Sequence, residues 1–252
     1  MGPGRSAMSN RTLVILALTV FVLTVLARAP ARWLVAAAPS AVECQLPAGS
    51  VWHGECARLR APGLELTALS WQLHPWSLLR GRLELEVHSA DPRAPGAATI
   101  AVGFGDQLSV RELRANLPLD SGFLPLFPAG WTGQLRLALK LVEFKAGRLD
   151  ALHGTVAASA LEQKNPAMEF GSYELLFADT ARTDGAIVGT LRDLGGPLAV
   201  TGTLTIRNGH DYELAGLAAA RSQATPELAR VVEFLGPADA QGRRNYSLAG
   251  SF

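Results

Sequence analysis

Two cysteines are the residues of this sequence whose type and spacing most clearly predict chemistry. Cys44 and Cys56 stand twelve positions apart and are the chain's only cysteines. If the domain folds outside the cytoplasm, we expect them to form a disulfide that closes a short loop and stabilises the fold by about 3 kcal/mol. Two unpaired structural cysteines are the alternative. A metal site is not expected, because the sequence has no CxxC and two thiolates do not complete a tetrahedral sphere without nearby histidine pairs.

The histidines and carboxylates form no recognisable catalytic set. The five histidines are scattered one to a segment, so a histidine oriented by a carboxylate could arise only through tertiary folding. They are His53, His74, His88, His153 and His210. Glu84 and Glu86 alternate with apolar residues, which places both on the polar face of a strand. Because GxSxG, HExxH and Walker A motifs are also absent, we expect no enzymatic activity and no cofactor, and an exported enzyme is kept only as an alternative.

Charge and length limit the functional and structural classes to which the protein can belong. The chain has 23 basic and 22 acidic residues, a net charge of +1, and only three of its basic residues are lysines. A nucleic-acid-binding domain usually carries a basic patch, so no nucleic-acid partner is predicted. About 210 residues follow the first 38, enough for one large domain or two small ones with an apolar core.

An uncharged apolar run covers residues 12–27. Eleven of the fifteen residues from Leu13 to Ala27 are Leu, Val, Ile or Phe, which favours insertion as a helix by about 5 kcal/mol. Sixteen residues rise only about 24 Å, so crossing roughly 30 Å of hydrocarbon requires the flanking Arg11 and Arg28 to snorkel to the two interfaces. We therefore predict a single transmembrane helix over residues 12–27, with Arg11 and Arg28 as its flanks.

A cleaved secretory signal is the alternative interpretation of the same run. Arg5 and Arg11 would be its positive region, and a small-residue cleavage site would lie near Ser40. Residues 28–32 contain two arginines and a proline, which is more typical of an interface flank and favours a retained anchor. Both interpretations export the rest of the chain. Since two arginines lie on each side of the run, the cysteine pair is the better indication of orientation.

Beyond residue 51 the sequence alternates between apolar and polar residues with period two. Such alternation puts apolar side chains on one face of a strand and polar ones on the other, as in half-buried antiparallel sheets. The clearest segments are residues 64–71, 82–88, 134–140, 198–207 and 212–217. Further segments, separated by Gly, Pro, Asn and Asp turns, are residues 108–117, 148–158, 173–177, 187–192 and 246–252.

A weak glycine repeat indicates how these strands are arranged. The pattern glycine, polar, apolar, polar, apolar begins at Gly81, Gly133 and Gly202, although chance recurrence is the alternative. Glycine at a strand start suits a bend or bulge, so the repeat favours a sheet that curls the same way at each pass. We predict a mainly β fold in which the transmembrane helix is followed by a curved, meander-type antiparallel sheet, half-barrel or sandwich-like, with one or two short helices.

The better of the two expected helices lies in residues 225–236. Thr225 fits the N-cap, Pro226 the first helical position and Gly236 the stop signal. The other lies around residues 120–127, where two prolines limit it to about one turn. An apolar segment of this kind between strands could plug one end of a curled sheet.

Several motifs, taken in order along the chain, resemble a known family. They are Val51–Gly54, Leu69–Pro75, Leu78–Gly81, Arg192–Leu198 and Leu235–Arg243. Together with the N-terminal apolar run, they make nearly the whole sequence similar to protein N of the bacterial type II secretion system. No single motif is diagnostic, but the ordered set is fairly specific. The cysteine pair is a local feature that is not carried over from the family.

The resemblance implies a single-pass protein of the Gram-negative inner membrane with its bulk in the periplasm. It also implies no catalytic activity, and the family is distantly similar to AsmA-like proteins, whose curved sheets form grooves for lipids. The organisation expected on this basis is a cytoplasmic N-terminus at residues 1–11, a transmembrane anchor at 12–27, a connector at 28–50 and a periplasmic β-rich domain at 51–252.

Two functions follow as expectations. The first is an accessory structural component of the type II secretion system, which helps to export folded proteins across the outer membrane and contacts the secretin and the inner-membrane platform. The second is a periplasmic carrier of lipid or another apolar ligand on the concave face of the sheet. A closed sandwich would seal the apolar faces against each other, whereas a carrier leaves an apolar trough open.

Overall fold

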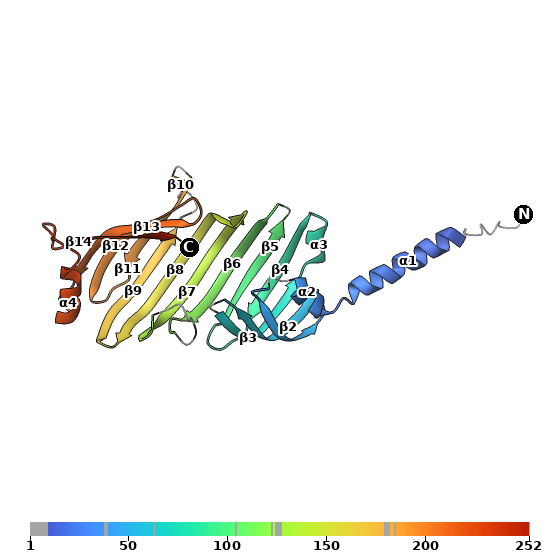
Figure 1. Ribbon diagram of the computed structural model, residues 1–252, viewed down its shortest axis with the longest axis horizontal. Coiled ribbons are helices and arrows are strands. Elements are labelled where there is room, and N and C mark those ends of the chain that lie inside the picture. The colour runs from blue at the N-terminus through green and yellow to red at the C-terminus, as the bar shows by residue number, and fades with distance from the viewer. Residues whose placement is uncertain are drawn as a thin grey trace, which may run out of the picture.

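The structure, a computed structural model, places 14 strands of the described residues in one sheet (Figure 1). The described residues are 10–37, 40–62, 64–103, 105–121, 123, 128–178, 182–183 and 185–251. The first seven strands are β1 (Glu43–Gly49), β2 (His53–Ala61), β3 (Leu64–Leu73), β4 (Arg82–Ser89), β5 (Gly96–Gly103), β6 (Gln107–Pro118) and β7 (Trp131–Lys145). The others are β8 (Arg148–Lys164), β9 (Ala167–Phe177), β10 (Arg182–Thr183), β11 (Ala186–Asp193), β12 (Leu198–Arg207), β13 (Asp211–Ala220) and β14 (Arg244–Ser251).

The strands follow one another through the sheet in sequence order. Every paired strand is antiparallel to its neighbour, and only the short β10 lies off the main path, where it pairs with β11. The predicted antiparallel meander is therefore confirmed. Each of the ten predicted strand segments lies within an observed strand, apart from Phe252, which is outside the described residues.

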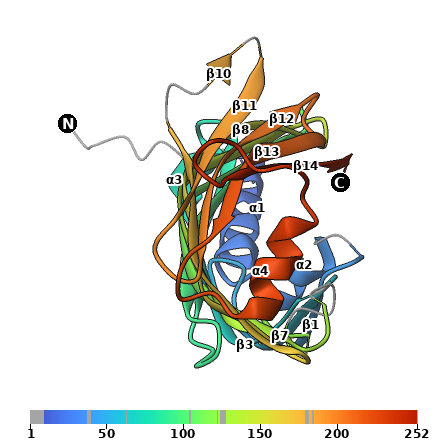
Figure 2. The same cartoon turned by 90° about the vertical axis from the view of Figure 1, so that its left-hand side faces the viewer.

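The sheet curls along its length, and β-bulges contribute to the curl (Figure 2). The register shifts within three strand pairs, β5 with β6, β7 with β8 and β8 with β9. Two glycines lie at such irregularities. Gly133, one of those singled out in the sequence, interrupts the pairing of β7, and Gly154 takes a φ of +124° opposite the shift at Leu139. A bulge bends a strand and increases its twist, so these positions help to curve the sheet.

Four helices accompany the sheet in the described part of the chain. They are α1 (Asn10–Ala27), α2 (Ala31–Ala37), α3 (Pro75–Leu78) and α4 (Pro226–Glu233). Helix α1 extends away from the β1 end of the sheet, whereas α2 and α4 lie inside the curve (Figures 1 and 2).

Helix α1 covers the apolar run predicted as a membrane anchor. None of the helices in the described residues is both long enough and apolar enough to cross a membrane. The transmembrane assignment of residues 12–27 therefore stays a prediction.

Residues 28–50, expected to be a connector, contain regular structure. They include α2 and the edge strand β1, which pairs with β2 from Glu43 to Gly49. Pro47 and Gly49 hide the strand in the sequence, but an edge strand accepts a proline because its N–H need not join the ladder. The sheet thus begins before residue 51.

The predicted C-terminal helix is present as α4. The hydroxyl of Thr225 accepts a hydrogen bond from the amide of Leu228 at 3.3 Å, as expected for an N-cap, and Pro226 is the first helical residue. The helix predicted around residues 120–127 falls largely outside the described residues. Of that segment, buried Phe123 donates its amide proton to the carboxylate of Asp120 at 2.8 Å, which forms a turn.

Candidate interaction surface

The concave face of the sheet is lined by apolar side chains and forms what we call the apolar trough. Cross-strand neighbours of an antiparallel pair point to the same face, so the register shows which side chains line it. One row across five strands consists of Leu85, Ile100, Val110, Val142 and Leu152. This row is on the side that contacts α2 and α4, inside the curve of Figure 2.

Helix α2 fills the end of the trough next to α1, which we call the proximal end. Its Leu34 and Val35 pack against buried Trp71 and the cysteines of β1 and β2. The indole Nε1 of Trp71 donates a hydrogen bond to the carbonyl of Val51 at 3.2 Å. An apolar cavity of about 140 Å³ remains between α2 and the sheet.

The structure joins Cys44 and Cys56 by the disulfide expected from the sequence. Their Cα atoms lie 5.8 Å apart, and the bond ties the edge strand β1 to β2 beneath α2. Structural disulfides are typical of proteins that fold outside the cytoplasm. The bond therefore supports an exported location for the sheet.

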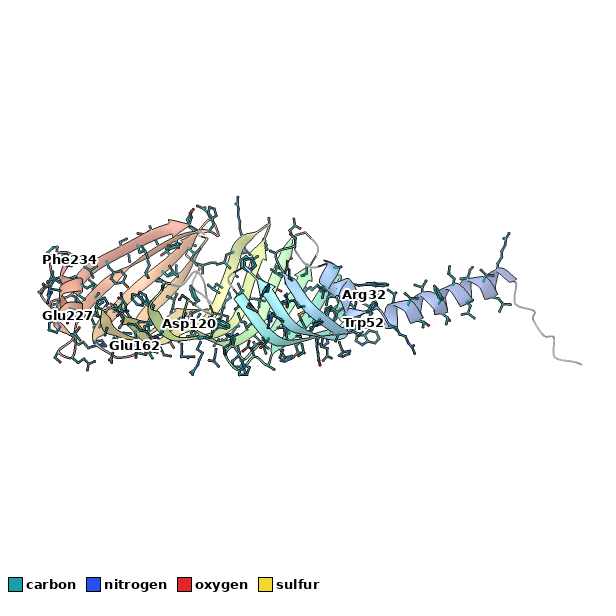
Figure 3. The ribbon with its side chains drawn as sticks, turned by 60° about the horizontal axis from the view of Figure 1, so that its bottom comes forward. Arg32, Trp52, Asp120, Glu162, Glu227 and Phe234 are labelled. Carbon is teal, nitrogen blue, oxygen red and sulfur yellow. A yellow bond between two sulfur atoms is a disulfide. The ribbon has the colours of Figure 1, made fainter. Side chains whose placement is uncertain are left out.

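Helix α4 fills the opposite, distal end of the trough. Leu228 and Val232 are buried against Leu198 and Val200 of β12. The helix presents the other side of its last turn to solvent, where Val231 and Phe234 are exposed. Figure 3 shows Glu227 and Phe234 at the end of the molecule farthest from α1.

The middle of the trough is not covered by any helix of the described chain (Figure 1). Several of its apolar side chains are only half-buried, although Leu139 is buried. Examples are Ile100, Leu113, Leu137, Val142 and Val156. Contiguous apolar surface of this kind usually marks an interaction or ligand-binding surface.

A partly buried ion pair clamps the turn beside the distal end. A guanidinium nitrogen of Arg221 lies 2.6 Å from the carboxylate of Asp193, and its other terminal nitrogen donates to the carbonyls of Gly196 and Leu198 at 2.9 and 3.0 Å. Burial acts to raise the pKa of Asp193, but the hydrogen bonds from Arg221 and from two backbone amides lower it below its ordinary value. The carboxylate is thus held ionised, and the β11–β12 turn is fixed to the end of β13.

Tyr173 adds a neutral donor next to this clamp. Its hydroxyl donates a hydrogen bond to the carbonyl of Phe170. Burial, together with the charge of Asp193, raises the pKa of Tyr173 to about 12. The phenol therefore stays protonated and serves as a structural hydrogen-bond donor.

The histidines and carboxylates lie where the sequence suggested, on polar surfaces. Glu86 lies between His74 and His88, with nitrogen to oxygen distances of 3.5 and 3.2 Å, and all three side chains are largely exposed. Within the described ranges, no three His, Cys, Asp or Glu side chains are grouped in a way that could hold a metal ion.

The two ends of the meander leave two edge strands. β1 is the proximal edge and β14 is the distal edge, and most side chains of both strands are exposed. An edge strand presents unpaired backbone N–H and C=O groups that can pair with a strand from another chain. The start of β14 is partly covered by a turn in which Ala238 bridges to Arg244. Its later residues pair with β13 on one side and have no strand on the other side in the described structure.

Comparison with known proteins bears on this architecture. A family model described as type II secretion system protein N matches residues 40–247. This match covers most of the chain and the sheet from β1 to β14. The chain belongs to this family.

Two curated relatives from the protein N family agree with the match. A type II secretion system protein N of Aeromonas hydrophila is 28% identical over 214 residues, which are 81% of this chain and 82% of the relative. A protein of the same name from Vibrio cholerae serotype O1 is 28% identical over 142 residues, 53% of this chain and 56% of the relative. No solved structure matches the chain.

The motifs that resemble the protein N family form turns and closely packed positions. A side chain at Gly54 would meet the ring of Trp71, since an added Cβ would lie 2.3 Å from it. Asp193 belongs to the clamp, and Asp239 accepts hydrogen bonds from the amides of Gln241 and Arg243 at 2.9 and 2.8 Å. These residues stabilise the frame of the sheet rather than perform chemistry.

The sequence did not reveal the contact that joins α1 to the sheet. The indole Nε1 of Trp52 donates a hydrogen bond to the carbonyl of Leu26 in the last turn of α1 at 2.9 Å. Arg11 and Arg28, the predicted anchor flanks, are exposed near the two ends of α1. The presence of Trp52 in a turn motif was the available signal for this contact, but its partner Leu26 lies 26 residues away in the sequence.

Proposed function

We propose that this protein is a non-catalytic, accessory structural component of the type II secretion system. In this proposal, residues 12–27 hold the chain in the inner membrane and the curved sheet contacts other secretion-system proteins in the periplasm, the secretin among them. The observation that supports it best is the form of the sheet, a long meander of the protein N family whose apolar trough and distal edge are free to receive a partner.

The exposure of α1 supports the anchoring part of the proposal. Large apolar side chains are exposed all around this helix, and only its last turn is tied to the sheet, through Trp52. A helix that is apolar on every side is stable only when buried in protein or in lipid. Residues 12–27 are short for a bilayer, so Arg11 and Arg28 snorkel to the headgroups, with residues 1–11 in the cytoplasm.

The distal edge supports the contact with periplasmic partners. If α1 crosses the inner membrane, the end of the sheet that carries β14 and α4 is farthest from the bilayer (Figure 1). β14 can accept a partner strand, and Phe234 and Leu248 offer exposed apolar contacts beside it. The secretin and other periplasmic parts of the apparatus are the partners that the proposal assigns to this region.

A deletion strain and site-specific photocrosslinking test this function. Deletion should leave folded substrates in the periplasm, and the intact chain should restore their secretion. A photoreactive residue at Leu248 should crosslink to a secretion-system protein, whereas one at Leu176, exposed on the convex face of β9, is the matched control. Normal secretion of several substrates by the deletion strain would contradict the proposal.

The uncovered middle of the trough favours a second function, the transport of a lipid or another apolar ligand. Native mass spectrometry of the full chain should then show bound lipid that is lost in Val156→Gln, within the trough. Leu176→Gln, on the opposite face, should keep it. Equal lipid content in the wild type and both variants would argue against a carrier and leave the trough to a protein partner.

A further inference from the structure

The connection between β3 and β4 ends in an exposed apolar tip. Trp76 of α3 is 77% exposed and Leu79, just after the helix, is 79% exposed, with Leu78 beside them also open to solvent. Arg80 and Arg82 follow directly and are exposed as well. A large aromatic ring and two leucines thus leave much of their apolar surface in water, which favours an apolar or interfacial partner for the tip.

Hydrogen bonds place the start of α3 at the end of the sheet to which α1 is joined. The side chain of Trp52 binds the carbonyl of Leu26 in α1, and the carbonyl of Trp52 accepts the amide of Leu73 at 2.7 Å. Helix α3 begins two residues after Leu73. Figure 1 accordingly shows α3 at the same end of the sheet as α1, and Figure 3 shows Trp52 and Arg32 at the junction.

The composition of this end matches a membrane interface. Four of the five tryptophans precede residue 77, and although Trp71 is buried in the core, Trp33 of α2 is half-exposed. Arg28 and Arg32 are exposed in the same segment. Tryptophan and arginine together are typical of the headgroup region, where the ring sits between oil and water and the guanidinium binds phosphate.

The distal end also exposes large apolar side chains, among them Val231, Phe234 and Leu235, but none of these is a tryptophan. Phe234 is exposed on α4, but its neighbours include the acidic Glu227 and Glu233. The remaining tryptophan, Trp131, lies away from α1 and stacks on Phe170 with ring centroids 4.5 Å apart. Only the proximal tip combines exposed tryptophan and leucine with arginines in the described structure.

We propose that the tip formed by Trp76, Leu78 and Leu79 is a second membrane contact, which inserts into the headgroup region of the bilayer beside α1. Arg80 and Arg82 bind the phosphates of anionic lipids at the same level. The proposal rests on the anchoring of α1 proposed above. With two contacts on the bilayer, the sheet has a fixed tilt and rotation on the membrane.

Quenching by brominated lipids tests this contact. The full chain is reconstituted into vesicles of phosphatidylethanolamine and phosphatidylglycerol whose acyl chains carry bromine near the headgroup, and tryptophan emission is compared with that in unbrominated vesicles. Trp76→Phe should lose a substantial part of the quenched emission. Trp131→Phe is the control and should lose emission that bromine does not quench.

A charge variant tests the role of the arginines. The part of the quenching that Trp76→Phe removes should increase when phosphatidylglycerol replaces phosphatidylethanolamine. The double variant Arg80→Glu with Arg82→Glu should lose this dependence on anionic lipid. Both side chains are exposed, so the variant should keep the sheet intact, which circular dichroism checks.

Flotation of the vesicles distinguishes the proposed anchoring by α1 from the proposed membrane contact of the tip. A chain that floats with the vesicles and shows quenching of Trp76 supports the contact. A chain that floats while Trp76 stays open to aqueous iodide and is not quenched by bromine overturns the contact and leaves the anchor in place. A chain that does not float overturns the anchor, and the contact with it.

Discussion

The two ends of the trough are closed by the same kind of element but held by different chemistry. At the proximal end α2 packs over a disulfide between β1 and β2, with Trp71 as the central side chain. At the distal end α4 packs on β12, and the adjacent turn is held by the ion pair of Asp193 and Arg221. A covalent bond is insensitive to pH and salt but sensitive to reductant, whereas the ion pair has the opposite sensitivities.

This difference shows that the strands near α1 and those far from it can be loosened independently. A single sheet with a strict neighbour-to-neighbour order has few contacts that bypass a weakened strand pair. The destabilisation caused by each change below should therefore be confined to the strands at the end of the sheet where the change is made. Hydrogen exchange of the backbone amides in each strand is the measurement that distinguishes the two ends.

Removal of the disulfide should have the largest effect. In Cys44→Ser with Cys56→Ser, the free energy for opening the β1–β2 hairpin should fall by about 3 kcal/mol, because the unfolded loop is no longer constrained. Dithiothreitol should reproduce the change in the wild type. Amides of β12 and β13 should exchange as before, and equal acceleration at both ends would show that the sheet opens as one unit.

Loss of the distal clamp should have the next largest effect. Arg221→Met leaves the partly buried carboxylate of Asp193 without its ion partner and frees two carbonyls, which should lower the stability of the β11–β12 turn by about 1–3 kcal/mol. Arg192→Met is the matched control, since its ion pair with Glu174 is more exposed and should contribute less than about 1 kcal/mol. Similar losses in the two variants would refute the special role of the clamp.

Acid should weaken the distal end through the same carboxylate. The pKa of Asp193 in the folded protein lies below its ordinary value of 3.8, so the stability it contributes is present above about pH 4 and is lost as the pH falls through the folded pKa. Amide exchange in β12 should therefore speed up, after correction for its intrinsic pH dependence, between pH 6 and pH 3. In Arg221→Met, the increase in exchange rate at low pH should be smaller than in the wild type. If the pH profile of exchange is unchanged, groups other than Asp193 cause the acid sensitivity.

The smallest effect should come from the N-cap of α4. Thr225→Ala removes the acceptor of the Leu228 amide and should destabilise the helix by about 1 kcal/mol. Ser222→Ala, at an exposed turn position just before the helix, is the control. The comparison is made by the exchange rates of amides in α4, and no difference between the variants would mean that packing of Leu228 alone holds the helix.

The sequence predicted the strands that alternate strongly and failed where alternation is weak. Residues 198–207 were predicted as a strand and form β12 with those bounds, because apolar and polar side chains follow each other there without interruption. β5 was missed because its small residues, such as Gly96 and Ala97, show no clear periodicity. α2 was missed because Pro30 and the adjacent arginines suggested a connector.

The site was harder to predict than the fold because it depends on how distant residues meet. Period-two alternation is the same in a closed sandwich and in an open trough, so the sequence left the shape of the sheet undecided. The cysteine pair could be predicted from its spacing, whereas the clamp joins residues 28 positions apart and the link of α1 to Trp52 spans 26. No local pattern records contacts of this length.

The neighbour-to-neighbour order of the strands also determines how the chain can reach its native state. Each strand finds its partner in the segment made just before it, so hairpins can form one after another from the N-terminal side, without closing long loops. The growing edge is exposed at every stage, and β14 is the last strand to occupy it. A chain threaded through a translocation channel from its N-terminus could build this sheet as it emerges, with the cysteine-linked hairpin as the first stable piece.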